Sequence, residues 1–316
     1  MTHETDAKRL HADVVVGVDI GGTKTALLAW ACASQTVLAQ DAFATPTEIG
    51  PEAMVDRLVE AIETLLTQCG QTSANLRAIG VAVPGLVDAQ AGMVLTAGNL
   101  AGWTQVPLRD LLQARLHPPV AIDHDANAAA LGERWRGAAQ DLATFAFVAL
   151  GTGIGVGIVL NGQLYRGAHH AAGELGDLVV GREFLGQDRG GQGNLAHLIG
   201  GKTLRGRAHE ATGHALRSVE VITRAVEDEA LAAMADEVVD YLGMAIIAIA
   251  ALLDPEAIIV GGGTAEAGED LLEPVRERVA REVPAPPVLI ASALGADAQL
   301  YGAVFAAFQQ EESRAG

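Results

Sequence analysis

Short runs of β-branched and aliphatic residues recur along the chain, and amphipathic segments of helical period lie between several of them. The runs predict strands over residues 14–20, 26–33, 35–42, 78–84, 119–123, 143–150, 155–160, 163–165, 257–260 and 288–291. Apolar residues at three- and four-residue spacing predict helices over 51–69, 108–116, 227–253, 271–283 and 300–311, and another from near Ala126. Glycines among polar residues between 181 and 201 predict an extended irregular loop. Strands that alternate with helices in both halves are typical of an α/β protein with largely parallel sheets.

The composition is that of a folded protein with more than one domain. The chain has 316 residues, half of them hydrophobic, and about 150 residues per domain predicts about two domains. Acidic residues outnumber basic ones by 39 to 21, and the net charge of −18 makes nucleic acid and anionic membranes poor partners. The two cysteines, Cys32 and Cys69, allow at most one disulfide and cannot form a thiolate metal cage.

Neither a membrane span nor a secretion signal is expected. The longest apolar stretch, 242–253, is shorter than the ~20 residues that a membrane-spanning helix needs. Residues 1–13 are polar and of mixed charge, without the apolar core of a signal peptide. We therefore expect a soluble cytoplasmic protein.

The first candidate site follows the first predicted strand, where the sequence reads Asp19-Ile-Gly-Gly-Thr-Lys24. Gly21 and Gly22 let backbone N–H groups approach an anion without obstruction by a Cβ atom. Thr23 and Lys24 can add a hydroxyl and an ammonium donor, and the Asp19 carboxylate could hold a hydrated Mg²⁺ beside phosphates. Taken alone, the motif is explained equally well by an ordinary hairpin turn.

Two further glycine motifs follow predicted strands. The first, Gly151-Thr-Gly-Ile-Gly-Val-Gly157, superficially resembles a dinucleotide loop, but that loop needs a helix after its glycines and a strand is predicted here. A turn that directs Thr152 and Gly153 at a phosphate fits better, and a purely structural glycine hairpin is the alternative. The second motif, Gly261-Gly262-Gly263, would let a flat nucleoside lie against the backbone, or it is a simple strand-to-helix turn.

The fourth motif, Asp123-His124-Asp125, lies where a predicted strand meets an alanine-rich helix. A carboxylate at such a junction lies close to the helix N-terminus, and Asp125 is the candidate general base. Either aspartate could instead cap the helix, which is a common role for Asp. Two aspartates that flank a histidine exceed what capping needs, and this favours a functional role.

In this order, the motifs resemble the ROK family of sugar kinases and related regulators, which has the two-lobed α/β fold of the actin-like ATPases (ribonuclease H-like). The matching segments are 19–24, 80–88, 98–103, 125–133, 151–157, 172–176 and 261–263, and the resemblance extends over about 14–308. It implies an active site in the cleft between the lobes and a homodimer. The small lobe is expected at 14–120 plus 300–316, and the large lobe at 121–295.

The resemblance implies an ATP- and Mg²⁺-dependent kinase that phosphorylates a sugar hydroxyl, most often the 6-OH of a hexose such as glucose. Asp125 would accept the hydroxyl proton and Asp19 would lie near the metal, bound through water. Sugar contacts are implied for Glu174, Asn99, His124 and Asp177. The residues implied to hold the nucleotide are Asp19, Gly21, Gly22, Thr23, Lys24, Thr152, Gly153, Gly261, Gly262 and Gly263.

The chain departs from the family pattern at several positions. His124 replaces the usual Asn, Asp177 replaces a usual His, and Ala196 stands in place of a Glu, with His197 beside it. Because segment 181–195 contains no cysteine, a structural zinc site of the family type is not expected. A different metal site that combines His169, His170, Asp177 and His197 is disfavoured, because no short ligand spacing connects these residues.

These departures leave the sugar open: fructose, mannose, N-acetylmannosamine and N-acetylglucosamine remain alternatives to glucose. Polyphosphate is the alternative phosphoryl donor. A transcriptional regulator is disfavoured because only thirteen residues precede the first strand, too few for a DNA-binding domain. A sugar-binding protein without catalysis is disfavoured because Asp19, Asp125 and the glycine motifs are all present.

Overall fold

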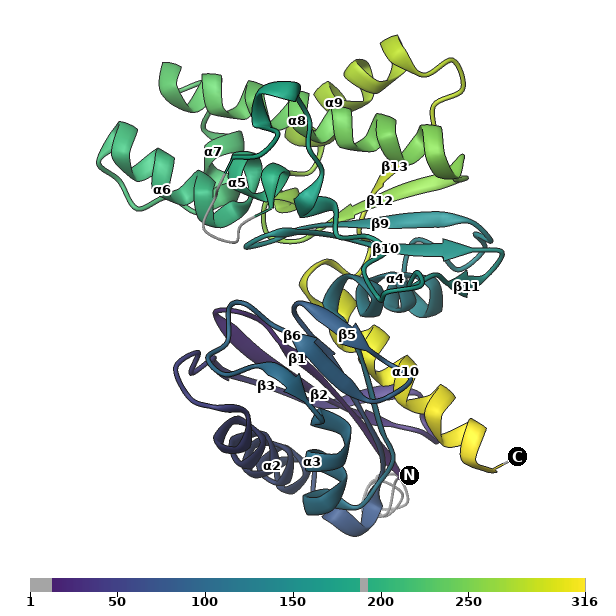
Figure 1. Cartoon of the computed structure of the whole chain (residues 1–316). Coiled ribbons are helices and arrows are strands. Elements are labelled where there is room, and N and C mark those ends of the chain that lie inside the picture. Colours follow the sequence, from purple (N-terminus) through teal and green to yellow (C-terminus); the bar gives the residue numbers. More distant parts are fainter. Residues whose placement is uncertain (1–12, 188–192, 316) are drawn as a thin grey trace, which may run out of the picture. The chain divides into compact units, whose positions relative to one another are not determined.

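The computed structural model describes residues 13–187 and 193–315, and these form two compact units (Figure 1). Unit 1 contains the described residues up to Trp135 and again from Asp297, and unit 2 contains Arg136–Ala296. The polar lead-in over 1–12 and residues 188–192 of the glycine-rich segment lie outside the described residues. In the part that is described, no helix is both long and apolar enough to cross a membrane.

Unit 1 contains a five-stranded sheet of order β3-β2-β1-β4-β8. Its strands are β1 (Val14–Ile20), β2 (Lys24–Ala31), β3 (Thr36–Ala44), β4 (Leu76–Val83) and β8 (Val120–His124). The first three strands are antiparallel neighbours, whereas β4 runs parallel to both β1 and β8. The sequence places residues after 120 in the large lobe; here β8 pairs with β4, so that β8 and the helix that follows it belong to unit 1.

Helices cover both faces of this sheet (Figure 1). On one face, Val14, Val16 and Val18 pack with apolar residues of α2 (Pro51–Gln68) and α3 (Leu108–Leu116). On the other face, Val15 and Leu28 pack with α10 (Ala298–Ala315). The alternation arises because successive side chains of a strand point to opposite faces of the sheet. Helix α4 (Asp125–Arg136) follows β8 directly.

Glycines let α10 approach its neighbours at backbone distance. A Cβ atom on Gly80 of β4 would lie 1.7 Å from the carbonyl oxygen of Ala303, and one on Gly17 would lie 2.6 Å from that of Leu300. A Cβ atom on Gly302 would lie 1.6 Å from the carbonyl oxygen of Ala128 in α4. Any larger residue at these positions would therefore force the helix away from the sheet or from α4.

Unit 1 also has a small sheet of order β5-β6-β7, formed by Leu86–Asp88, Met93–Thr96 and Thr104–Val106. None of these strands is predicted from the sequence, because each is short and mixes polar with apolar residues. The Arg109 guanidinium attaches this region to the main sheet. It donates to the carbonyl oxygens of Ala89 and Gln90 after β5, and to that of Val120 in β8.

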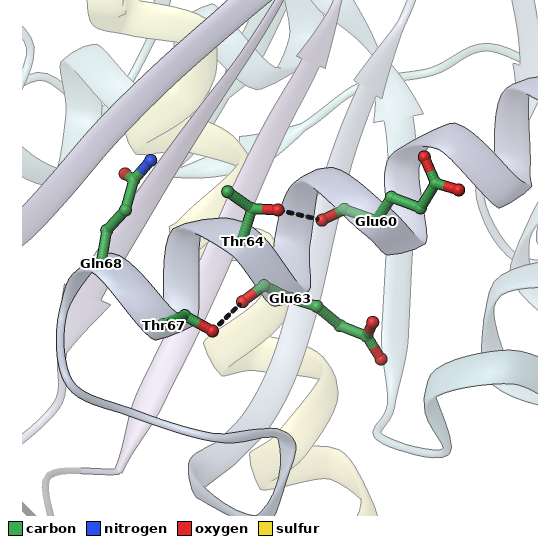
Figure 2. Close-up of a pocket in the computed structure, with 5 residues that line it drawn as sticks. All are labelled: Glu60, Glu63, Thr64, Thr67 and Gln68. Atoms are coloured by element: carbon green, nitrogen blue, oxygen red, sulfur yellow. Dashed lines mark hydrogen bonds between the residues drawn. The ribbon is translucent and has the colours of Figure 1, made fainter.

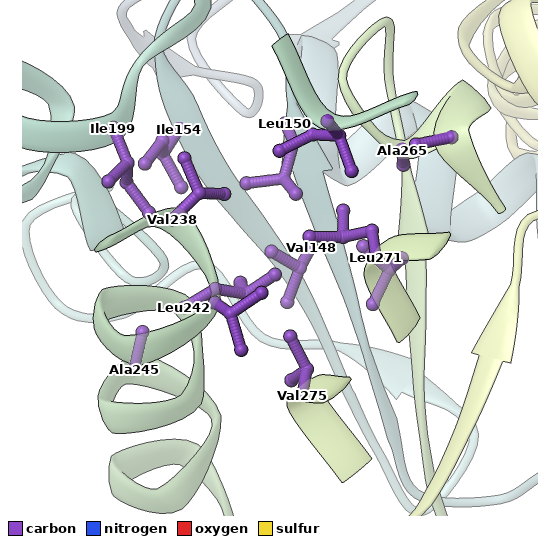
Figure 3. Packing of buried hydrophobic residues seen from close by; sticks show 14 of the residues in the cluster. Val148, Leu150, Ile154, Ile199, Val238, Leu242, Ala245, Ala265, Leu271 and Val275 are labelled. Carbon is purple, nitrogen blue, oxygen red and sulfur yellow. The ribbon is translucent and has the colours of Figure 1, made fainter. Parts of the chain in front are cut away.

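Unit 2 is built on a second five-stranded sheet, of order β11-β10-β9-β12-β13. The strands are β9 (Phe145–Leu150), β10 (Ile154–Leu160), β11 (Gln163–Leu164), β12 (Ala257–Gly261) and β13 (Val288–Ala291). β9 is antiparallel to β10 and parallel to β12. One face packs against α8 (Glu229–Leu253) and α9 (Glu269–Glu282), so that Val148 lies in one apolar core with Leu242 and Val275 (Figure 3).

The predicted irregular loop over 181–201 is wrong for part of its length. The described residues include α5 (Asn194–Ile199), and α6 (Gly201–Thr212) begins at the last residue of that range. Leu195 and Ile199 are both buried at a spacing of four residues, a helical signal that the surrounding glycines obscured. Helix α7 (Ser218–Thr223) follows, and it was not predicted either. The other short elements are 3₁₀ turns, at Ser73–Asn75, Leu175–Asp177, Arg182–Phe184, Ala265–Ala267 and Gly295–Asp297.

Candidate active site

In unit 1, the candidate residues gather where the parallel strands β1, β4 and β8 end. Asp19 lies opposite Ala82, and Ala82 lies opposite Asp123, so the two carboxylates stand two strands apart at the same level of the sheet. Carboxyl ends of parallel strands share one edge of a sheet, which is a common location for ligand sites in α/β proteins. Asp125, the first residue of α4, follows at the same edge.

The turn between β1 and β2 closes tightly and presents its glycine backbone. The Gly21 N–H donates to the carbonyl oxygen of Lys24 at 3.0 Å, and a Cβ atom on Gly21 would lie 2.7 Å from that oxygen. Thr45 holds the turn from outside: its Oγ1 donates to the Gly21 carbonyl at 2.7 Å, and its N–H donates to the Thr23 carbonyl at 3.0 Å. Thr45 gave no signal in the sequence, because it acts on residues more than twenty positions away.

Asn99 lies beside this turn, on the loop between β6 and β7. A Cβ atom on Gly22 would stand 3.9 Å from the Cβ atom of Asn99. The Asn99 side chain is exposed, as are Thr23 and Lys24. Unit 1 therefore brings together the predicted phosphate motif and one of the predicted sugar contacts.

The two aspartates that flank His124 have different partners. Asp123 is 3% exposed, and its Oδ1 accepts the His124 N–H and the Asn127 Nδ2 amide, each at 2.9 Å. Asp125 is only partly buried; its Oδ1 accepts the Ala126 N–H at 2.6 Å and lies 3.1 Å from His124 Nε2. Asp123 thus braces the strand–helix junction. The sequence left open which aspartate has that role.

The Asp19 carboxyl is short of positive charge. Burial and repulsion by the Asp125 carboxylate raise the pKa of Asp19 from 3.8 to about 7, and the attraction of Lys24 offsets only part of this. A divalent cation would relieve both effects, so the residues fit a Mg²⁺ ion. No cluster of three or more His, Cys, Asp or Glu residues suited to a metal occurs in the described part of the chain. Such an ion would therefore depend on phosphate oxygens and water, as Mg²⁺ commonly does.

In unit 2, two glycine turns meet at one edge of the sheet. The β9–β10 turn is closed by the Gly151 N–H, which donates to the Gly153 carbonyl at 3.0 Å. At the end of β12, Gly262 has a φ of +90°, and a Cβ atom on it would lie 2.6 Å from the carbonyl oxygen of Leu150. The Thr264 N–H donates to that same carbonyl at 3.1 Å. Glycine is therefore needed at position 262 for two reasons. A side chain would clash with the Leu150 carbonyl, and the positive φ is unfavourable for other residues.

Further contacts fix both turns of unit 2. The Lys202 N–H, at the start of α6, donates to the Thr152 carbonyl at 3.2 Å. The Thr264 hydroxyl donates to the Ser218 hydroxyl at 2.9 Å, and both side chains are buried. Ser218 could not be identified from the sequence, because its role depends on a partner 46 positions away.

The predicted sugar contacts of unit 2, Glu174 and Asp177, lie at the 3₁₀ turn Leu175–Asp177. Glu174 is partly buried immediately before this turn, whereas the Asp177 side chain is exposed. A Cβ atom on Gly176 would lie 3.2 Å from the Cβ atom of Ala196, so Ala196 of α5 packs directly against this turn. Two of the positions at which the chain departs from the family pattern therefore lie close together.

The sequence model of the ROK family matches residues 15–310. The chain belongs to the ROK family. This ROK protein is 32% identical to a glucokinase of Halalkalibacterium halodurans, over 94% of its own length and 96% of that enzyme. Its sequence is 31% identical to that of a ROK hexokinase from Thermus thermophilus with a known crystal structure. The two structures match with a TM-score of 0.78 over 96% of this chain and 100% of that one.

A ROK family glucokinase from Streptomyces griseus, crystallised in complex with glucose and AMPPNP, is 30% identical to this ROK protein. Its TM-score is 0.79, over 94% of this chain and 99% of that one. These likenesses confirm the predicted family and the fold class, the actin-like ATPase fold of the ROK kinases.

The ROK protein also has a hollow of about 440 Å³ on the outer side of α2 (Figure 2). The threonine hydroxyls that line it already form hydrogen bonds within the helix. Thr64 donates to the Glu60 carbonyl at 2.8 Å, and Thr67 donates to the Glu63 carbonyl at 2.9 Å. Exposed carboxylates line it together with these threonines, and none of the motif residues does. We assign it no function.

Proposed function

We propose that this protein is an ATP-dependent sugar kinase that transfers the γ-phosphoryl group to a hexose hydroxyl, with the 6-OH of glucose as the expected acceptor. The observation that carries the proposal is the Asp125 carboxylate. Its Oδ1 is engaged by Ala126 and His124, whereas Oδ2 has no hydrogen-bond partner among residues 13–187 and 193–315. A carboxylate held by one oxygen with the other available is suited to accept a proton.

Asp125 would take the proton from the sugar hydroxyl as that oxygen attacks the terminal phosphorus. A positioned general base typically contributes 10²–10⁴-fold to the rate. Phosphoryl transfer otherwise depends on positioning and on neutralising charge. Gly21, Gly22, Thr23 and Lys24 in unit 1 would serve the phosphates. In unit 2, Thr152 and Gly153 would have the same role, while the backbone at Gly261, Gly262 and Gly263 would accommodate the nucleoside.

Mg²⁺ bound near Asp19, through water, would supply charge neutralisation on the phosphates. The raised pKa of Asp19 supports this assignment, because the partly buried anion lacks a sufficient counter-charge. The residues proposed to contact the sugar are Glu174, Asn99 and Asp177. Glucose is favoured by two relatives, the glucokinases of H. halodurans and S. griseus.

A coupled assay tests this proposal. Purified protein is given Mg²⁺, with ATP or polyphosphate as donor, and a panel of glucose, fructose, mannose, N-acetylmannosamine and N-acetylglucosamine. Turnover with ATP and glucose is expected. Asp125→Asn should lower kcat by about 10²–10⁴-fold while the circular dichroism spectrum stays unchanged. Asp141→Asn, at an exposed turn position, is the matched control.

Sugar binding by calorimetry without turnover on any sugar would identify a non-catalytic sugar-binding protein and reject the kinase. Turnover by Asp125→Asn within a few-fold of the parent would reject Asp125 as the base.

We further propose a cytoplasmic homodimer. The homodimer is supported by the large apolar side chains of Met244 and Leu252, which are 47% and 82% exposed on α8. Light scattering after size exclusion tests the dimer, and a monomer at micromolar concentration would reject it.

A further inference from the structure

We propose that His124 is a positioning residue for the general base: its imidazole Nε2–H donates to Asp125 Oδ1 and fixes the orientation of the carboxylate. The inference rests on the proposed function, because it concerns the same base. It gives His124 a role different from the direct sugar contact expected from the sequence.

The geometry of the strand–helix junction brings the two side chains together. His124 is the last residue of β8 and Asp125 is the first of α4, and the change from strand to helix turns their side chains toward each other. Nε2 lies 3.1 Å from Oδ1, and the His124 side chain is only 12% exposed. An ionised carboxylate only accepts hydrogen bonds, so Nε2 carries the proton in this contact.

The backbone at His124 is itself held. Its N–H donates to Asp123 Oδ1, and that oxygen also accepts the amide of Asn127 from the first turn of α4. Asp123 is almost fully buried, so this support is shielded from water. The His124 imidazole therefore extends from a well-supported part of unit 1, and its hydrogen bond can hold the Asp125 carboxylate in a fixed orientation.

Two donors on one oxygen determine how the carboxylate is presented. The terminal torsion of an aspartate is broad and roughly two-fold, so a carboxylate with one donor can exchange its oxygens or tilt. The Ala126 N–H approaches Oδ1 from the helix backbone and His124 approaches it through a side chain. Together they direct the lone pairs of Oδ2 in one direction. Loss of His124 should therefore slow the chemical step and leave substrate affinity nearly unchanged.

Three variants separate this role from the alternatives. His124→Leu removes the donor at similar volume, and His124→Gln places an amide N–H close to the position of Nε2. For the leucine variant we expect kcat to fall about 10- to 100-fold, the loss expected for one hydrogen bond to a charged group. KM for the sugar and for ATP should change less than twofold. The glutamine variant should recover most of kcat, and His124→Ala replaces the leucine variant if that chain does not fold.

The effect must also operate through Asp125. In the Asp125→Asn background, His124→Leu should cost less than twofold in kcat, because the base that it orients is gone. An equal loss in both backgrounds overturns the inference, and so does a rise in sugar KM with kcat unchanged, which would mean a direct sugar contact. Loss of turnover in Asp125→Asn combined with full activity in His124→Leu overturns this inference alone. Absence of turnover in the parent protein on every sugar overturns the proposed function together with it.

Discussion

Replacing Asp19 by Asn should stabilise the protein in the absence of nucleotide and metal, although Asp19 is the residue proposed to serve the metal. The pKa of this carboxyl is about 7 in the folded chain, against an ordinary value of 3.8. A shift of one pKa unit corresponds to about 1.4 kcal/mol, so the anion costs the folded state up to about 4 kcal/mol. Because the side chain is partly accessible to solvent, we expect about 2–4 kcal/mol.

The sign of the pH dependence follows from proton binding. Between about pH 4 and pH 7, Asp19 holds its proton in the folded chain but has lost it in the unfolded chain. The unfolded state therefore binds fewer protons, and this residue makes the free energy of unfolding fall as pH rises through that window. Above pH 7 the full penalty is present, and well below pH 4 there is none.

Urea unfolding followed by circular dichroism at pH 5, 6, 7 and 8, with EDTA present, measures this contribution. Asp19→Asn should be more stable than the parent at pH 8, and the difference should shrink by about half or more at pH 5. Asp141→Asn, the exposed control, should show no such trend. A variant that is less stable than the parent at pH 8, or a difference independent of pH, would refute the electrostatic reasoning. The gain in stability should accompany a loss of Mg²⁺-dependent turnover, as is common at functional sites.

The remaining predictions concern electrostatics and packing in the same structure. Carboxyl NMR titration should show the pKa of Asp19 falling below about 7 in Asp125→Asn, because a repelling charge is removed, and rising in Lys24→Met, because an attracting charge is lost; a shift in the opposite direction in either variant contradicts the assignment. Gly302→Ala should destabilise the protein by about 1–3 kcal/mol or more in urea unfolding, because its Cβ would overlap a backbone carbonyl. Gly206→Ala, where a Cβ meets nothing within 4 Å, should instead stabilise α6 by up to about 1 kcal/mol, and equal effects at the two glycines would contradict this account.

Local patterns in the sequence were sufficient to predict most of the regular structure. The prediction of β1 at 14–20 and of α3 at 108–116 agrees with the structure to the residue, because a continuous apolar run and a clear three- and four-residue spacing define them. The weakly patterned segments were missed. Glycines obscured α5, and the short strands of the β5-β6-β7 sheet have too few residues to show a period.

Contacts between distant residues could not be predicted in the same way. The glycine motifs indicated where the backbone can approach a ligand, but not that Thr45 holds the first turn or that Ser218 pairs with Thr264. The sequence indicates Asp125 as the candidate base, but it leaves open which of the two aspartates that flank His124 supports the helix. Only the structure shows that the buried Asp123 braces the strand–helix junction, and that one oxygen of Asp125 remains available. Gly80 likewise gave no sign that it adjoins α10, because its neighbour Ala303 comes from the far end of the chain.

The origin of α10 has a consequence for how the chain is made. The sheet of unit 1 is complete once β8 has been synthesised, but the helix that covers its second face follows the entire sequence of unit 2. On the ribosome, the surface around Val15 and Leu28 therefore remains uncovered while unit 2 is translated. A fragment that stops before residue 298 would have an intact hydrogen-bonded sheet and an open apolar face. Such a fragment would be a substrate for chaperones, and so would the growing chain until α10 has been synthesised.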